Sequence, residues 1–481
     1  MTSTRSRDLS KAATGIPGLD EITDGGFPRG RSTLICGSAG SGKTLLAISF
    51  LVNGIQQFGE PGVLMSFEEN VKELSSDVAS LGYDLPSLID GGKLAIDYVH
   101  VERQEIEETG EYDLEGLFVR LNHAITTVGA KRVVLDTIES LFSGLSNEAL
   151  LRAELRRLFR WLKDRDVTAV ITGERGDGSL TRHGLEEYVS DAVILLDHRI
   201  ENSISTRRLR VVKYRGSHHG TNEYPFLIDR DGIQVLPVTS LGLAHQVVDT
   251  RLSTGIADLD RMLGGSGVYR GSTVLVSGTA GTGKTSLAAH FVDAACARGE
   301  KALWFLLEES PLQVIRNMRS IGLDFAPWVE RGLLHFLADR PSRYGLEAHL
   351  AGVHRAVRAH QPSVVVIDPI TNLLQIGTPS EVRIMLARII DYLKTAGVTA
   401  LFTSLTPGRR SAMESTAGIS SLMDTWLVLT FAESRQERRR ALAILKSRGM
   451  AHSNRIHEFI FTDRGIELMD TTPVDQTPVT A

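Results

Sequence analysis

Two eight-residue stretches of the chain have the glycine and lysine spacing of a phosphate-binding loop. Both match G-x-x-x-x-G-K-[ST], in which glycines let the backbone wrap around a polyphosphate and successive N–H groups face its oxygens. Lys43 and Lys284 are expected to reach the terminal phosphates, and the hydroxyls of Thr44 and Thr285 to ligate Mg²⁺. The predicted phosphate-binding residues are Gly37, Ser38, Ala39, Gly40, Ser41, Gly42, Lys43 and Thr44, and Gly278, Thr279, Ala280, Gly281, Thr282, Gly283, Lys284 and Thr285.

Paired glutamates follow a second predicted strand in each half. Glu68 and Glu69 end one apolar run, and Glu308 and Glu309 end the other. Carboxylates at the carboxyl end of a buried strand lie where α/β sheets bind ligands. There they can orient or deprotonate a water, or a hydroxyl, that faces the γ-phosphate. A solvated turn is the alternative interpretation.

A third predicted strand ends in Asp136 in the first half and in Asp368 in the second. An apolar run that ends in Asp after a phosphate-binding loop is typical of the acid that holds Mg²⁺ through its water shell. The alternative is an aspartate that caps the next helix.

Cations at alternate positions follow the last long strand of each half: Lys213 and Arg215, then Lys446 and Arg448. Alternate residues of a strand point to one face, so each pair suits a phosphate of a neighbouring subunit. An edge strand charged against aggregation is the alternative. The Arg-rich run at residues 435–440 is interpreted as a solvated turn rather than a nucleic-acid patch.

The elements that must position these residues recur along the chain. The two loops are 241 positions apart, and residues 14–20 recur as 254–260, which indicates a tandem duplication. Each loop lies between a strand-like run, at 32–36 or 273–277, and a helix-like run, at 45–50 or 286–291. Later strands alternate with helices, which predicts an α/β fold with a mainly parallel, helix-covered sheet in each half.

Composition narrows the class of protein. The 481 residues fit two domains, predicted at 1–245 and 246–468, with an unstructured tail at 469–481. A net charge of −5 does not favour a nucleic-acid binder, and two cysteines far apart in sequence predict neither a disulfide framework nor a zinc site. Because the sequence has no apolar run of about 20 residues, we expect no membrane span and a cytoplasmic protein.

The order and spacing of these motifs resemble the KaiC family, hexameric ATPases of the RecA-like superfamily. The resemblance covers residues 14–468 and depends on the duplicated G-I-x-x-L-D opening, P-loop, E-E pair, strand-end Asp and K-x-R-G extension. It implies two stacked rings with ATP between neighbouring subunits. It also implies Mg-ATP bound through the P-loops with Asp136 and Asp368, catalysis by the E-E pairs, and cross-subunit contacts from the K-x-R-G cations.

The resemblance also implies autophosphorylation by the second half, and possible sites can be aligned. Ser420 and Ser421 match the family's phosphorylated Ser-Thr pair, whereas the first half has residues 186–188, Glu-Glu-Tyr, at that place. Glu308 is expected to take the proton of the accepting hydroxyl, and autophosphatase activity is a further expectation. The alternative is that the two serines cap or pack a loop.

The sequence departs from the family pattern at several positions, which limits how far the family's properties can be expected here. Ser421 replaces Thr, and Pro369 follows Asp368 where Thr137 follows Asp136, which predicts a different loop. Only 13 residues follow Leu468, which argues against a KaiA-type partner, whereas a KaiB-type partner on the first ring stays open.

Two other classes of function compete with this prediction. A RecA-like DNA-dependent ATPase is disfavoured because residues 141–150 and 372–381 are poor in the basic residues of a strand-binding channel. A nucleotide-gated scaffold with little turnover is the other alternative.

Overall fold

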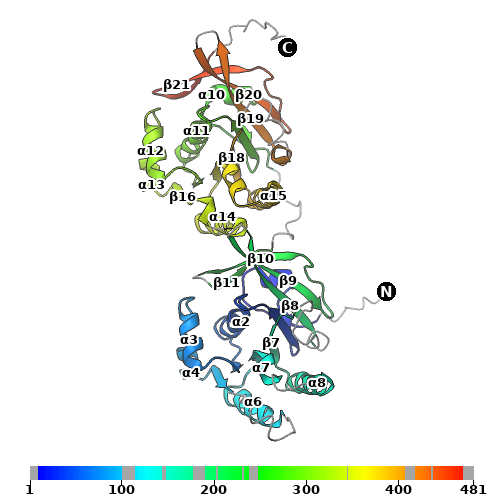
Figure 1. Cartoon of the computed structure of the whole chain (residues 1–481). Helices are drawn as coiled ribbons and strands as arrows, with labels where there is room; N and C mark the ends of the chain where they lie inside the picture. The colour runs from blue at the N-terminus through cyan, green and yellow to red at the C-terminus, as the bar shows by residue number, and fades with distance from the viewer. Residues whose placement is uncertain are drawn as a thin grey trace, which may run out of the picture. The chain divides into compact units, whose positions relative to one another are not determined.

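The computed structural model describes residues 9–99, 114–142, 148–176, 190–201, 204–229, 232–237, 248–343, 345–406, 418–434 and 437–469. It divides into two compact units, Met1–Ser240 and Leu241–Ala481. In each unit a central sheet is flanked by helices (Figure 1). The predicted tail beyond residue 469 and the segment 186–188 lie outside the described residues. No helix within the described ranges is both long and apolar enough to cross a lipid bilayer.

The first unit contains a nine-stranded sheet within its described residues. The strands around β3 are parallel, and β8 to β11 extend the sheet in antiparallel pairs. In spatial order they are β11 (Gly232–Val235), β10 (Glu223–Asp229), β9 (Ile204–Tyr214), β8 (Ala192–Glu201), β3 (Ser32–Gly37), β7 (Thr168–Glu174), β6 (Arg132–Asp136), β4 (Gly62–Ser66) and β5 (Leu94–Tyr98). β8 and β9 form an antiparallel hairpin, and the K-x-R-G residues lie at its end.

Helices cover both faces of this sheet. Apolar side chains of α2 pack on one face and those of α6 and α8 on the other, because alternate residues of the parallel strands are apolar on both sides. The helices are α1 (Leu19–Ile22), α2 (Lys43–Phe58), α3 (Val71–Ala79), α4 (Leu85–Asp90), α6 (Glu115–Val128), α7 (Ile138–Phe142) and α8 (Glu148–Asp164), and a small sheet pairs β1 (Lys11–Ala12) with β2 (Phe27–Pro28).

The second unit repeats this topology. Its strands, in spatial order, are β16 (Leu334–Ala338), β15 (Ala302–Leu306), β17 (Val364–Asp368), β18 (Thr399–Leu405), β14 (Thr273–Gly278), β19 (Thr425–Ser434), β20 (Glu437–Ser447), β21 (His457–Thr462) and β22 (Gly465–Leu468). Its other elements are β12 (Arg251–Leu252), β13 (Val268–Tyr269), α10 (Ala257–Met262), α11 (Lys284–Ala297), α12 (Pro311–Arg319), α13 (Ala326–Glu330), η1 (Pro341–Arg343), α14 (Leu346–His360), η2 (Ile370–Gln375) and α15 (Pro379–Thr395). The predicted α/β class is confirmed.

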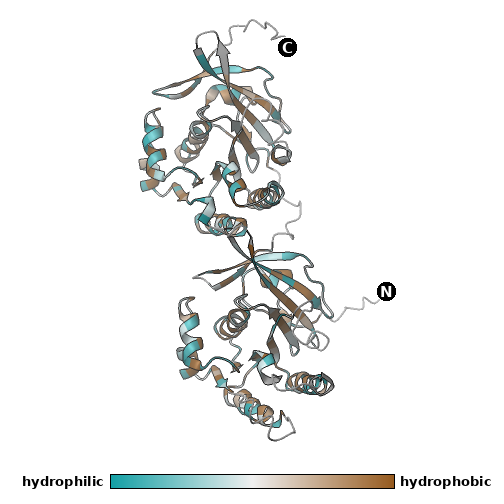
Figure 2. Ribbon diagram, viewed as in Figure 1, coloured by the Kyte–Doolittle hydropathy of each residue, from teal (hydrophilic) through white to brown (hydrophobic). Residues whose placement is uncertain are grey.

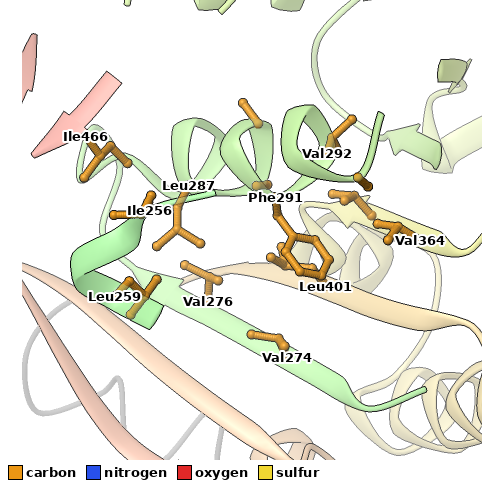
Figure 3. Close-up of a cluster of buried hydrophobic side chains, with 14 of the residues drawn as sticks. Ile256, Leu259, Val274, Val276, Leu287, Phe291, Val292, Val364, Leu401 and Ile466 are labelled. Atoms are coloured by element: carbon orange, nitrogen blue, oxygen red, sulfur yellow. The ribbon is translucent and has the colours of Figure 1, made fainter. Parts of the chain in front are cut away.

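The core of the second unit lies between α11 and the sheet. Leu287 and Phe291 of α11 point toward Val274 and Val276 of β14 (Figure 3), and all four side chains are buried. The central strands are mostly apolar, whereas the surrounding helices show both apolar and polar residues (Figure 2). This core fixes the start of α11, where the second P-loop ends.

The duplicated opening motif closes a turn in each unit. The Asp20 carboxylate accepts hydrogen bonds from the backbone N–H of Thr14, at 2.8 Å, and from its hydroxyl, at 2.7 Å. Asp260 accepts the same two bonds from Thr254 at the same distances. The aspartate of G-I-x-x-L-D therefore stabilises the chain just before the P-loop strand.

A buried histidine joins the last hairpin of the second unit to the P-loop helix. His290 of α11 accepts a hydrogen bond at Nε2 from the Ile466 N–H, at 3.0 Å. Burial lowers the pKa of His290 from its ordinary 6.5, against the opposing effect of Asp293. Because a protonated ring carries an N–H at both nitrogens, it can no longer accept this bond.

We expect acid to weaken the second unit through His290. As the pH falls below 6.5, the unfolded histidine binds a proton that the folded one excludes, so the free energy of unfolding decreases. His290→Gln keeps an acceptor for the Ile466 N–H but cannot titrate, so its free energy of unfolding should decrease less with falling pH than that of the wild type. The difference between the two proteins should grow by up to about 1.4 kcal/mol per pH unit. Urea titrations of both proteins between pH 7 and 5 test this, and parallel curves contradict it. His354, whose pKa burial lowers to about 4, is common to both proteins and cancels in the comparison.

Candidate functional site

The first P-loop connects β3 to α2 and needs its first and third glycines. A Cβ on Gly37 would lie 2.7 Å from the Leu196 carbonyl oxygen of β8. Gly42 has φ 101°, a conformation that favours glycine, and its Cβ would lie 2.9 Å from Ile228 of β10. The antiparallel extension therefore packs against the back of the loop.

The second P-loop repeats these restrictions more tightly. A Cβ on Gly278 would lie 2.4 Å from the Leu429 carbonyl oxygen of β19. Gly283 again has φ 101°, and its Cβ would lie 2.6 Å from the ring of Phe461 in β21. The two loops thus share one backbone form, which directs N–H groups and a helix N-terminus toward an anion.

Both P-loop lysines are buried, and their ammonium groups lie against loop carbonyls. Lys43 Nζ donates to the Gly37 oxygen at 3.0 Å and to the Ser38 oxygen at 3.1 Å. Lys284 Nζ donates to the Thr279 oxygen at 2.8 Å. Burial lowers the pKa of Lys284, although Asp368 and Glu308 attract its charge. A terminal phosphate bound at the loop would offer these ammonium groups a stronger, anionic acceptor.

The strand-end acids lie beside the P-loop threonines. Asp136 is buried and accepts a hydrogen bond from the Thr172 hydroxyl. Burial raises the pKa of its carboxyl group, against the lowering effect of the Thr172 and Thr44 hydroxyls. Burial likewise raises the pKa of Asp368, which accepts a hydrogen bond from the Thr403 hydroxyl and lies near the Thr285 hydroxyl.

This donor set fits a magnesium ion. Each half offers a threonine hydroxyl and a carboxylate, oxygen donors of the kind that Mg²⁺ prefers. The Thr44 hydroxyl lies near enough to Asp136, and the Thr285 hydroxyl near enough to Asp368, to lower the pKa of the carboxyl group, so each pair stands at one place in its unit. A buried carboxylate with a raised pKa also gains from a cation that compensates its charge.

Strand register brings the first glutamate pair to the same edge. Ser66 of β4 lies opposite Asp136 of β6, so the acids that follow each strand are neighbours. The Glu68 carboxylate accepts hydrogen bonds from the hydroxyls of Thr137, at 2.7 Å, and Ser140, at 2.9 Å. Ser66 binds the backbone of Glu69, whose pKa is raised by burial and by nearby carboxylates. The two acids thus have different environments.

The second pair has a similar setting. Leu306 of β15 lies opposite Asp368, and the Leu307 N–H donates to the Asp368 carbonyl oxygen at 2.9 Å. Burial and the charges of Asp368 and Glu308 raise the pKa of Glu309. In both units the glutamates follow the end of their strand by two and three residues.

The turn after each strand-end acid is alike in one respect and different in another. The peptide bonds Asp136–Thr137 and Asp368–Pro369 are both cis, so proline does not set the second half apart there. The following segment does differ, since it is α7 in the first unit and the 3-10 helix η2 in the second.

Comparison with known proteins agrees with this geometry. A family model described as "ATPase: KaiC" matches residues 12–240 and again residues 252–472. The chain belongs to the KaiC family of ATPases. It is 56% identical to "Circadian clock protein KaiC2" of Synechocystis over 97% of its length and 82% of that protein. It is 37% identical to "Circadian clock oscillator protein KaiC" of Synechococcus elongatus, over 96% of its length and 90% of that protein. The RecA-like, duplicated fold is thereby confirmed.

The K-x-R-G cations of this KaiC-family chain lie at the end of the antiparallel extension. Lys213 of β9 pairs with Val193 of β8, and the Arg215 N–H donates to the Asp191 oxygen at 2.9 Å. Lys446 and Arg448 contact residues 420–424 of their own chain. Contacts with a neighbouring subunit's nucleotide involve a second copy and stay a prediction.

The aligned serines differ in exposure. Ser420 is 7% exposed, whereas Ser421 is exposed and its hydroxyl donates to the Gly418 oxygen at 3.1 Å. The structure therefore gives the two hydroxyls different access from solvent.

Sequence reasoning missed Arg440. The interpretation of residues 435–440 as a solvated turn is wrong for residues 437–440, which lie in β20. Arg440 donates from Nε to the Gly281 oxygen of the second P-loop at 3.2 Å. Its guanidinium also lies over the rings of Phe461, at 4.8 Å, and Phe431, at 5.7 Å. Arg207, opposite His198 in the first unit, holds the equivalent position in the hairpin, and this repeat was the signal available in the sequence.

Proposed function

We propose that this KaiC-family protein is a homohexameric, Mg²⁺-dependent ATPase whose second domain also phosphorylates its own Ser420 and Ser421. The observation that carries the proposal is the shared sheet edge. In each unit it gathers the P-loop lysine, the threonine–aspartate pair and the glutamate pair. The second unit adds two adjacent serines next to Lys446 and Arg448.

In the first domain, residues 1–245, the acceptor of the phosphoryl group is water. Lys43 and the loop N–H groups bind the phosphate oxygens, and Asp136 with Thr44 would hold Mg²⁺, which neutralises charge on the phosphates when bound. Glu68, oriented by Thr137 and Ser140, takes a proton from the attacking water. Glu69 lies beside it and shares its negative field.

In the second domain, residues 246–468, a serine hydroxyl replaces the water. Its Oγ attacks the γ-phosphorus, its proton passes to Glu308 of the adjacent subunit, and the bond to the β–γ bridging oxygen breaks to release ADP. Lys284 offsets the charge of the transferred group. Reversal of this transfer, or hydrolysis of the phosphoserine, gives the autophosphatase activity.

Cross-subunit catalysis requires a ring. Lys213, Arg215, Lys446 and Arg448 are proposed to contact the nucleotide of the next subunit, where a cation can offset the charge of the transition state. The relatives are named circadian clock proteins, so we also propose a signalling role in the cytoplasm, read through the phosphorylation or nucleotide state. A KaiB-type protein is the partner proposed for the first ring.

Intact-mass analysis before and after incubation with Mg-ATP tests the autokinase. We expect up to two added phosphates per chain, on peptides that contain Ser420 and Ser421. Ser420→Ala with Ser421→Ala should abolish the added mass without changing the oligomer. Active protein that gains no phosphate on either serine overturns the kinase, whereas protein that stays monomeric in saturating Mg-ATP overturns the ring.

A further inference from the structure

The acceptor segment, residues 418–424, is held by two cations of its own chain. Lys446 Nζ donates to the Ser420 carbonyl oxygen at 3.0 Å and to that of Met423 at 2.7 Å. Arg448 Nη2 donates to the Ser421 carbonyl oxygen at 2.7 Å. The two side chains therefore bind three backbone oxygens, on both serines and just after them.

A separate set of contacts fixes the end of this segment. The Asp424 carboxylate accepts from the N–H and the hydroxyl of Thr273, both at 2.9 Å, and pairs with Lys394 at 2.8 Å. The Arg448 N–H also donates to the Asp424 carbonyl oxygen at 2.9 Å. Asp424 is thus tied to β14, the P-loop strand, and the serines sit three and four residues before this anchor.

The cations are well suited to this task. Hydrogen bonds from a charged donor are stronger than neutral ones, and two donors from one ammonium group restrict both carbonyls at once. Lys446 is partly buried, and burial, with the like charge of Arg448, lowers its pKa. The surroundings of Lys446 therefore disfavour its positive charge, and the carbonyl oxygens of Ser420 and Met423 stabilise that charge in place of water.

We propose that Lys446 and Arg448 are positioning residues that fix the backbone of Ser420 and Ser421, and thereby the place from which each hydroxyl meets the adjacent subunit's nucleotide. This inference rests on the proposed autokinase for its consequence, but not for the contacts. It adds a second task to cations that were assigned only to the phosphate across the interface. The same two side chains would then both contact the phosphate of the neighbouring subunit's nucleotide and position the accepting serines.

Hydrogen exchange of the full-length protein in Mg-ATP tests the positioning directly. The Leu422 and Met423 amides donate to the Ile419 and Ser420 oxygens, so they report on the segment. In Lys446→Met we expect their exchange to rise about tenfold or more, because a charge-assisted anchor is lost. Lys446→Arg should restore most of the protection. Arg439→Gln, which removes a β20 cation paired with Glu458, is the matched control and should leave these amides unchanged.

Phosphate mapping of the same proteins tests the consequence. At saturating Mg-ATP, Lys446→Met and Arg448→Met should change the ratio of phosphate on Ser420 to that on Ser421 by about threefold or more, as expected for a displaced acceptor. A pure nucleotide contact would lower both sites together and keep the ratio. Unchanged exchange and an unchanged ratio overturn the inference. Wild-type protein without phosphate on either serine overturns the autokinase instead, and the exchange result then still decides the positioning.

Discussion

Glu68→Gln should lower ATP hydrolysis by the first domain by about 10²–10⁴-fold, the range lost when a positioned general base is removed. Gln keeps an oxygen that can accept from Thr137 and Ser140, which hold Glu68 at 2.7 and 2.9 Å, so the turn should survive. The loss would then be one of proton transfer. ADP release, measured in a background of Glu308→Gln and Glu309→Gln, isolates the first domain.

The matched control is Glu73→Gln on the neighbouring helix. Glu73 completes the capping box of α3 with Asn70 and adds to the negative field at Glu69. Glutamine also completes a capping box, so this variant removes a nearby charge and keeps the fold. Its turnover should stay within about twofold of wild type, since no proton acceptor is lost.

Glu69→Gln separates the two carboxylates. Glu69 is fixed through its backbone by Ser66, whereas the Glu68 carboxylate itself is oriented by two hydroxyls. Orientation of the reacting group favours Glu68 as the base, so its loss should cost more. The raised pKa of Glu69 is the argument for Glu69 as the base instead. If both variants bind nucleotide equally well and Glu69→Gln loses more ATP hydrolysis than Glu68→Gln, the base is Glu69.

The elements with strong local signals were predictable from sequence. β6 and β17 end at the predicted aspartates, because a short run of buried, mostly apolar residues that stops at an Asp is a strong strand signal. The P-loops could be predicted because their glycines meet steric demands, such as the 2.4 Å approach at Gly278, that other residues do not satisfy. The edge strand β5 was missed, since its sequence mixes apolar with polar residues and its burial is partial.

Contacts between side chains and backbone oxygens left no such signal. The positions of Lys446 and Arg448 suggested one exposed face and a phosphate, but their partners here are carbonyl groups, which every residue has. Thr172 and Thr403, the partners of the strand-end acids, lie in strands of mostly apolar and small residues, where a threonine equally fits by strand propensity. Arg440 was missed because the arginines beside it obscured the repeat with Arg207.

Asp368→Asn should have opposite effects on the second domain with and without nucleotide. In nucleotide-free protein we expect its unfolding temperature to rise above wild type. The Asp368 carboxylate is 7% exposed and burial raises its pKa, so its ionisation costs stability in the fold. Asn removes the charge and keeps an oxygen for the Thr403 hydroxyl. The gain should be absent below pH 3.8, where the unfolded acid is also protonated, and present at pH 7.

With nucleotide the order should reverse. A ligand at 100 times its Kd stabilises the folded state by about 2.7 kcal/mol, and wild-type protein should show this in Mg²⁺ and a non-hydrolysable ATP analogue. The variant should lose most of that gain, because the oxygen donor set of Asp368 and Thr285 is broken. Calorimetry without and with the ligand measures the unfolding temperature of the nucleotide-free domain and its increase on binding. The corresponding variant of the first domain, Asp136→Asn, identifies which transition belongs to which domain.

Opposite signs distinguish a metal-holding acid from a structural one. If Asp368 only capped the following turn, Asn could still act as a cap, and both measurements would stay near wild type. If the carboxylate supported the sheet edge, both would fall. A carboxylate that binds the cation arriving with the nucleotide gives a third pattern. Because its charge costs stability without the cation, its removal makes the nucleotide-free domain more stable and the nucleotide-bound domain less stable. Asp463→Asn, in the exposed turn after β21, should change neither.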